Sequence, residues 1–192
     1  MKASIISIAA SALALLGAAQ GHALPDDIPD VTWNMRINPT DENSATVSIT
    51  GTIERAMAKM EADYPGWKAL LDQVPASKGL SLEDSGPPTI NCNVAGDNYA
   101  FASYVMDGIS HLRSQAGYAQ NDPGKCGRVS CSYGAGILWC NNAKELLNVP
   151  WPAIADTASK IVEVCAGKDK PSYVKGHADF ESWTAIIRAE DC

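Results

Sequence analysis

The chain contains six cysteines, and all six lie after residue 88. An even set of cysteines in an oxidising compartment forms disulfides by default, so we predict three bridges that lock the second part of the chain. The sequence leaves their connectivity open. It disfavours a bridge between Cys126 and Cys131, which lie about 16 Å apart if the segment between them is an extended strand. The predicted disulfide residues are Cys92, Cys126, Cys131, Cys140, Cys165 and Cys192.

The beginning of the chain has the layout of a secretory signal peptide. A lysine follows the first methionine, residues 5–16 are almost entirely apolar, and the small residues Gly21 and Ala23 are placed for cleavage after Ala23. The apolar run is shorter than the about 20 residues that a membrane-spanning helix needs. We therefore predict a signal peptide over residues 1–23, a secreted, extracellular mature protein and no membrane span.

Charge divides the rest of the chain at the same place as the cysteines. Residues 24–87 carry eleven acidic and five basic side chains, a net charge of −6, whereas residues 88–192 carry eleven and nine, a net charge of −2. Residues 73–88 are rich in glycine and proline, which is typical of a linker. We predict an acidic N-terminal segment and linker over 24–87 and a disulfide-bonded domain over 88–192.

The N-terminal segment predicts a hairpin followed by a helix. Apolar and polar residues alternate over 31–37, and residues 45–50 indicate a second strand after a turn-rich stretch. A helix that begins near Thr52 would end at Pro65. Such a small unit without disulfides needs a partner surface, so it is either a permanent cover on the C-terminal domain or a pro-segment that is later removed. The chain has no pair of adjacent basic residues, a common processing signal, and we favour the cover.

The C-terminal domain predicts an α+β fold with the element order β-α-β-β-α-β. Apolar residues recur at steps of three and four over 101–112 and 154–165, which indicates two helices. This order is that of the split-βαβ (ferredoxin-like) fold, a two-layer sandwich in which two helices cover one face of a four-stranded antiparallel sheet. The predicted strands are residues 89–94, 128–133, 137–141 and 180–189, with a hairpin turn at residues 134–136.

Six short motifs carry a resemblance to a known group of proteins. They are I-N-C, D-G-I-x-x-L-R, C-G-R-V-S-C-S-Y, I-L-W-C-N-N, a helix ending in Val-Cys, and W-T-A-I-I-R-A-E-D-C. Over residues 90–192 the chain resembles small secreted cysteine-rich proteins of filamentous fungi, an effector-like and killer-toxin-like group with an α/β plait. The resemblance implies a fungal source and a role outside the cell, and it provides no catalytic residues.

Composition and motifs argue against several classes of function. The net charge of −7 does not suit a nucleic-acid binder, which needs clustered lysine and arginine. The nearest cysteines are separated by four residues, and neither histidine of the mature chain lies beside a cysteine, so we expect no metal site. We also expect no cofactor, because the chain has no phosphate-binding loop, and it lacks the G-x-S-x-G and H-E-x-x-H motifs of hydrolases.

Three sets of polar residues are weaker catalytic candidates. Asp107 and His111 stand four residues apart on a predicted helix, where a solvated pair is the simpler interpretation. Ser130, beside Cys131, would need a general base that the sequence does not locate. His177, with Asp179 and Glu181, would share one face of a strand, a pattern that suggests a metal-binding or hydrolytic cluster but equally a solvated strand edge.

Tryptophan supplies the candidate ligand contacts. Alternation places Trp139 on the face opposite Leu138, and it places Trp183 on the same strand face as His177 if the strand is regular that far. An exposed tryptophan could stack on a sugar or fill a pocket of a partner, although a core position is common in small domains. The possible ligand contacts are therefore Trp183, Trp139 and His177.

These observations lead to one main functional hypothesis and two alternatives. The main one is a secreted, disulfide-stabilised, non-enzymatic protein, an effector or antagonism factor that acts on an extracellular protein or glycan. The first alternative is a carbohydrate-binding or inhibitor module that uses Trp183 or Trp139. The second is a small secreted hydrolase that uses His177 with Asp179 or Glu181. The oligomeric state stays open.

Overall fold

A five-stranded antiparallel sheet forms the centre of the protein in the computed structural model, which describes residues 28–74, 86–94, 98–167 and 172–192. Two of its strands, β7 (Ala135–Asn141) and β11 (Trp183–Ala189), are rich in isoleucine and tryptophan, which favour strands, and every residue of β7 is buried. In order across the sheet, the strands are β3 (Thr89–Asn91), β10 (Gly176–Asp179), β11 (Trp183–Ala189), β7 (Ala135–Asn141) and β6 (Cys126–Ser132).

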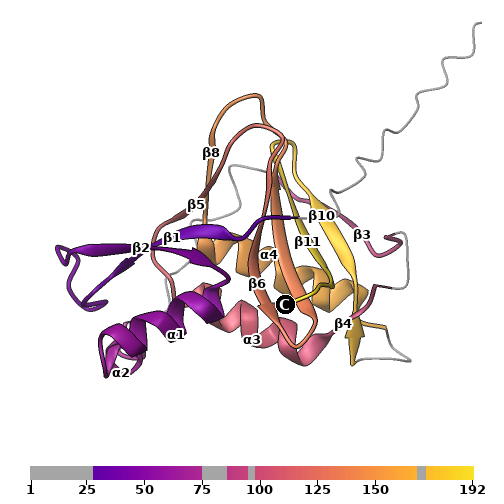
Figure 1. The fold of residues 1–192 in the computed structure, drawn as a ribbon. Helices are drawn as coiled ribbons and strands as arrows, with labels where there is room; N and C mark the ends of the chain where they lie inside the picture. Colours follow the sequence, from indigo (N-terminus) through magenta and orange to yellow (C-terminus); the bar gives the residue numbers. More distant parts are fainter. Residues whose placement is uncertain (1–27, 75–85, 95–97, 168–171) are drawn as a thin grey trace, which may run out of the picture.

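Two helices, α3 (Ala102–Arg113) and α4 (Trp151–Cys165), pack together on one face of this sheet (Figure 1). In α4, Pro152 occupies the first turn, where a missing N–H costs nothing. Both helices have one apolar stripe, and it faces the sheet and the partner helix. The buried residues of α3 are Ala102, Val105, Gly108, Ile109 and Leu112.

Two short pairs of strands lie at opposite ends of the helices. β4 (Ala100–Phe101) leads into α3 and pairs with β9 (Tyr173–Val174), and the carbonyl of Ser172 accepts the first amide of the helix at 2.9 Å. β5 (Tyr118–Asn121) follows α3 and pairs with β8 (Leu147–Pro150), which leads into α4. Each pair therefore connects the residues next to one end of a helix with a segment that is distant in the sequence.

The N-terminal part consists of a hairpin and two helices. β1 (Val31–Arg36) and β2 (Thr46–Gly51) are antiparallel, and α1 (Ile53–Asp63) and α2 (Trp67–Leu71) follow. Burial alternates along β1, as its alternating sequence predicts. The hairpin and the first helix thus lie where the sequence indicates them.

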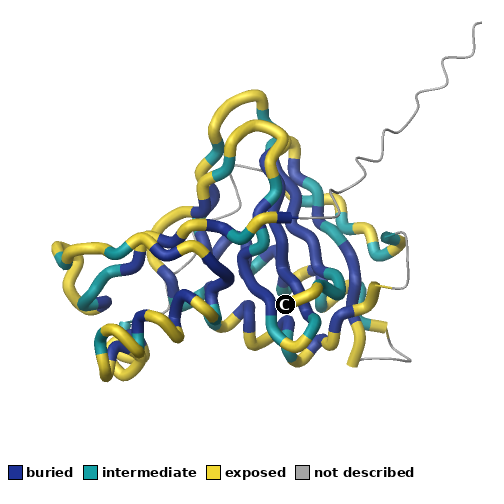
Figure 2. The backbone as a smooth tube through the Cα atoms, viewed as in Figure 1, coloured by how far each residue is buried: buried dark blue, intermediate teal, exposed yellow. Residues whose placement is uncertain are grey.

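The N-terminal part shares one hydrophobic core with the disulfide-bonded part. Trp33 of β1 stacks on Trp151 of α4, with 3.9 Å between the ring centroids. Residues of α1, including Met60, belong to the same buried cluster as Val105 and Ile154. Figure 2 shows buried residues, in dark blue, in the hairpin and α1 as well as in the sheet and the helices packed on it. The hairpin, α1 and α2 therefore contribute side chains to the main core.

The six cysteines form three disulfides, as predicted. Cys92–Cys165 ties the segment after β3 to the end of α4, and Cys126–Cys140 joins directly opposed residues of β6 and β7. Cys131–Cys192 fixes the C-terminal residue to β6. Cys126 and Cys131 do not pair with each other.

The α+β class is confirmed, and the ferredoxin-like arrangement is not. We predicted one last strand over residues 180–189, but the chain reverses there, because the amide of Phe180 donates to the carbonyl of Trp183 at 2.8 Å. The result is an additional strand, β10, between β3 and β11. The hairpin turn between β6 and β7 lies at residues 133–134 and not at 134–136, because Ser132 pairs with Ala135.

Two predictions fall outside the described residues. These are the signal peptide over 1–23 and most of the linker over 73–88. Within the described ranges, the structure contains no helix that is long and apolar enough to cross a membrane.

Candidate functional site

Four aromatic side chains form a continuous row at the surface, which we call the aromatic row. Phe101 contacts Tyr173 of the paired strand with 4.5 Å between centroids, and it meets Tyr104 of α3 edge-on at 6.0 Å. Tyr104 stacks in turn on Tyr133 of the β6–β7 turn, at 4.7 Å. Three of the four residues are exposed, and Tyr104 is half-buried. The row brings β4, β9, α3 and the hairpin turn together.

Tyr133 is the most exposed and the most strained member of the row. It is 78% exposed, and its φ of 48° lies in the left-handed region, where it is the only residue other than glycine among those described. Together with Gly134, at φ 77°, it forms a two-residue turn in which both central residues have positive φ, a turn that favours Asn-Gly. A bulky residue in this conformation costs on the order of 1–2 kcal/mol. Strain of this kind clusters at functional sites.

An open polar hollow of about 490 Å³ lies beside the row. The hairpin turn forms part of its wall, since Gly134 lines it, and the C-terminal end of β11 forms another part. The close approach of Glu190 to Gly136 requires a glycine there, because a Cβ would collide with the glutamate side chain. The lining residues are Asn98, Gly134, Arg188, Ala189, Glu190 and Asp191.

The charges at the base of the hollow are largely compensated within the protein. Glu190 is paired with Arg188 by a hydrogen bond and with Arg128 at 3.7 Å. By contrast, Asn98 and Asp191 are exposed, and each accepts a hydrogen bond through its backbone carbonyl, from Ala189 at 2.9 Å and from Arg128 at 3.0 Å, while its side chain has no hydrogen-bond or ion-pair partner among the described residues. Within the described residues, the hollow therefore offers an amide and a carboxylate without partners beside a compensated ion pair.

A second hollow, of about 280 Å³, lies on another part of the surface between β1, β5 and β8. Its wall includes Tyr118, which is 56% exposed and stands in an extended strand. Tyr118 is therefore an exposed tyrosine without backbone strain and outside the aromatic row.

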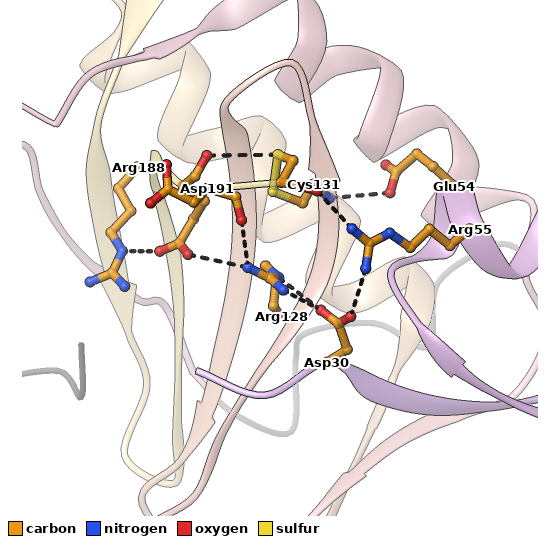
Figure 3. Close-up of polar contacts among 9 residues, drawn as sticks. Asp30, Glu54, Arg55, Arg128, Cys131, Arg188 and Asp191 are labelled. Atoms are coloured by element: carbon orange, nitrogen blue, oxygen red, sulfur yellow. Dashed lines mark hydrogen bonds and ion pairs between the residues drawn. A yellow bond between two sulfur atoms is a disulfide. The ribbon is translucent and has the colours of Figure 1, made fainter. Parts of the chain in front are cut away.

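Arg128 of β6 is the centre of a polar network that joins the N-terminal part to the C-terminus (Figure 3). Its guanidinium contacts Oδ1 of Asp30 through Nε, at 2.8 Å, and through Nη2, at 2.7 Å, while Nη1 donates to the backbone carbonyl of Asp191 at 3.0 Å. Arg55 of α1 bridges Asp30, at 3.4 Å, and the carbonyl of Cys192, at 2.7 Å. These contacts hold the hollow's C-terminal wall in place.

Glu54 of α1 forms a second polar contact with the disulfide-bonded part. Its carboxylate accepts hydrogen bonds from the hydroxyl of Ser130 at 2.5 Å and from the amide of Cys131 at 3.1 Å, and His111 Nδ1 lies 4.0 Å away. Burial by itself would raise the pKa of Glu54, but the proximity of His111 and the two hydrogen bonds outweigh it and lower the pKa below 4.5. The carboxylate is thus ionised near neutral pH.

This cluster does not form a nucleophilic serine site. Ser130 is 1% exposed, and its hydroxyl points to Glu54. A serine nucleophile needs an accessible oxygen that is hydrogen-bonded to its base. His111, which the sequence places four residues from Asp107, instead faces Glu54. The geometry is that of a joint between α1, α3 and β6.

Both tryptophans suggested as ligand contacts are buried. Trp139 has no exposed surface, and Trp183, 2% exposed, stacks on Phe180 at 4.3 Å. A sugar therefore has no tryptophan face to stack on at either position. Trp139 and Leu138 belong to different buried clusters, in agreement with the predicted alternation.

His177 lies on β10 with Asp179, and the two side chains approach to 3.3 Å. The strand ends at Asp179, so Glu181 falls in the turn and does not continue their face. The expectation that Trp183 shares this face is wrong, because the chain reverses between the two strands and His177 pairs with Ile186. Among the described residues, no three His, Cys, Asp or Glu side chains are grouped to hold a metal.

Sequence reasoning missed the aromatic row. The helical spacing of Phe101, Tyr104 and Val105 predicts that all three belong to the buried stripe of one helix. In the structure α3 begins at Ala102, so Phe101 lies before the helix. The sequence contains one signal for the row: a tyrosine precedes Gly134 in a predicted hairpin turn, at the position where asparagine is favoured.

Comparison of the chain with protein families, curated proteins and solved structures gave no match.

Proposed function

We propose that the protein is secreted and acts without catalysis, as an effector or antagonism factor that binds a target outside the cell through the aromatic row. The observation that carries the proposal is the placement of Tyr133. A tyrosine that is 78% exposed is held at positive φ in a turn that favours asparagine. Stability alone does not explain this choice, since asparagine would relieve the strain.

The chemistry of the row suits recognition. Tyrosine presents a large and rigid apolar area with a polar tip, and it is enriched at binding surfaces. Ring contacts at 4.5 to 6.0 Å hold the four side chains against one another, so little rotamer freedom remains to be lost on binding. The row is therefore preorganised before it meets a target.

The scaffold supports the same role. All three disulfides lie in the part of the chain that carries the row, and Cys131–Cys192 lies close to the turn. Disulfides of this density are typical of secreted proteins. The resemblance of residues 90–192 to small secreted fungal proteins also supports an extracellular role and a fungal source.

The test is a binding assay with the full mature chain on washed cell-wall preparations from plants, fungi and bacteria. The wild type is compared with Tyr133→Ala and with the matched control Tyr118→Ala. We expect the wild type and the control to bind at least one preparation, and Tyr133→Ala to bind about tenfold more weakly, as the loss of an aromatic anchor predicts. No binding by the wild type, or equal binding by Tyr133→Ala, would contradict the proposal.

A further inference from the structure

We infer that the aromatic row and the adjacent polar hollow together form a binding site for a neutral oligosaccharide. This inference rests on the proposed function and names the class of its target. It depends on the position of Gly134, which follows Tyr133 in the turn and also lines the hollow. An aromatic platform and a set of free polar groups therefore meet at one edge.

The aromatic row supplies the stacking surface that a sugar ring needs. A pyranose presents C–H bonds on its faces and hydroxyls around its rim, and the negative face of an aromatic ring attracts polarised C–H groups. Tyr133 uses one ring face for Tyr104 and is otherwise exposed. The row continues through Phe101 to Tyr173, so further aromatic side chains lie next to this stacking position.

The hollow supplies hydrogen-bonding groups for the rim of the sugar. The amide of Asn98 both donates and accepts, and the carboxylate of Asp191 accepts from two directions. Both groups line the hollow, and neither has a partner among the described residues. Two adjacent hydroxyls of a sugar can donate to a carboxylate, or can donate to and accept from an amide, at the same time.

Charge favours a neutral ligand over an acidic one. The arginine at the base, Arg188, is engaged by Glu190, which is also paired with Arg128, so neither charge is left over for a ligand of opposite sign. Asp191 adds a negative charge that disfavours an acidic sugar.

A protein partner fits the same surface less well. Protein hot spots lie in apolar pockets that become fully desolvated, with polar groups at the rim. Here the hollow is lined by an amide, a carboxylate and an ion pair, and a partner that covered them would have to satisfy every one. An oligosaccharide satisfies them with its hydroxyls.

The experiment measures affinities of the full mature chain by calorimetry for soluble oligomers of glucose, mannose and N-acetylglucosamine, and for oligogalacturonate as the acidic comparison. The variants are Tyr133→Ala, Asn98→Ala and Asp191→Ala, with Tyr118→Ala as the control. We expect at least one neutral oligomer to bind. Tyr133→Ala should weaken it about tenfold and each polar variant about fivefold, while the control leaves it unchanged.

The outcomes separate this inference from the proposed function. In one outcome, the protein binds no neutral oligomer but binds cell walls through Tyr133, and protease treatment of the cell walls abolishes this binding. The target is then a protein, the oligosaccharide inference is wrong, and the proposed function stands. Preferred binding of oligogalacturonate would overturn the charge argument. If the wild-type protein binds none of the cell-wall preparations, the proposed function itself is wrong.

Discussion

Trp33 and Trp151 lie with their ring centroids 3.9 Å apart and their planes at 25°, and they join the N-terminal hairpin to the beginning of α4. Trp33 also donates a hydrogen bond from Nε1 to the carbonyl of Gly51 at 2.8 Å, across its own hairpin. One side chain therefore fixes the hairpin internally and docks it on a helix of the disulfide-bonded part. Residues 28–74 thus pack on the disulfide-bonded part, and that they form a permanent cover and not a pro-segment stays a prediction.

Replacement of Trp33 should destabilise the whole protein. Trp33→Ala removes a ring that is 1% exposed and should lower the free energy of unfolding by about 3–5 kcal/mol. Trp33→Phe keeps an aromatic ring against Trp151 and should cost less. Urea unfolding, followed by circular dichroism, should show one transition for each variant. A separate early transition of the N-terminal part would contradict a shared core.

The polar network predicts a contrast between two aspartates. Asp30→Asn weakens a charged contact whose partners are only 16–17% exposed, and it should cost about 1–2 kcal/mol of stability. Asp63→Asn removes an exposed ion pair with Lys59 on α1 and should cost less than about 0.5 kcal/mol. Thermal and urea unfolding of both variants measure the difference. Equal costs would mean that the network does not hold the N-terminal part in place.

The ionised carboxylate of Glu54 should make the free energy of unfolding fall in acid. Its pKa in the folded protein lies below the ordinary value of 4.5, so its contribution is complete above that value and disappears as pH falls through the folded pKa. Glu54→Gln should therefore cost roughly 2 kcal/mol near neutral pH, and the cost should shrink in acid. The exposed Glu163→Gln is the matched control. A cost of Glu54→Gln that does not change with pH would contradict the assigned ionisation.

The three disulfides should differ in their contribution to stability. In the chain-entropy description, the Cys126–Cys140 loop of 14 residues is worth about 3 kcal/mol, and the loops of 61 and 73 residues are each worth about 4 kcal/mol. Paired Cys→Ala substitutions, one bridge at a time, test this order by urea unfolding. The order is wrong if removal of Cys126–Cys140 costs the most.

Local sequence patterns predicted the local structure well. Alternation located β1, helical spacing located most of α3 and α4, and the even cysteine count gave three bridges. β10 was missed because Gly176–Asp179 contains no β-branched residue, and it is a strand only because it pairs with β3 and β11. Such long-range pairing is also the reason that the sequence did not reveal the strand order.

The candidate site escaped prediction for the same reason. Phe101 and Tyr173 are 72 positions apart in sequence order, and they meet only because β4 pairs with β9. The tryptophans were plausible contacts on composition alone, yet a small core buries its largest side chains first. Burial of Trp139 and Trp183 and exposure of Tyr133 follow from packing that no local pattern encodes.

The most direct test of Tyr133 as the binding residue is to measure the stability and the cell-wall binding of Tyr133→Asn together. Asparagine tolerates positive φ, so this variant should be about 1 kcal/mol more stable than Tyr133→Ala, which retains the strain. Its binding to the cell-wall preparations should nevertheless fall about tenfold, as for Tyr133→Ala. A stable Tyr133→Asn protein that binds as well as the wild type would show that the exposed, strained tyrosine is not the binding residue.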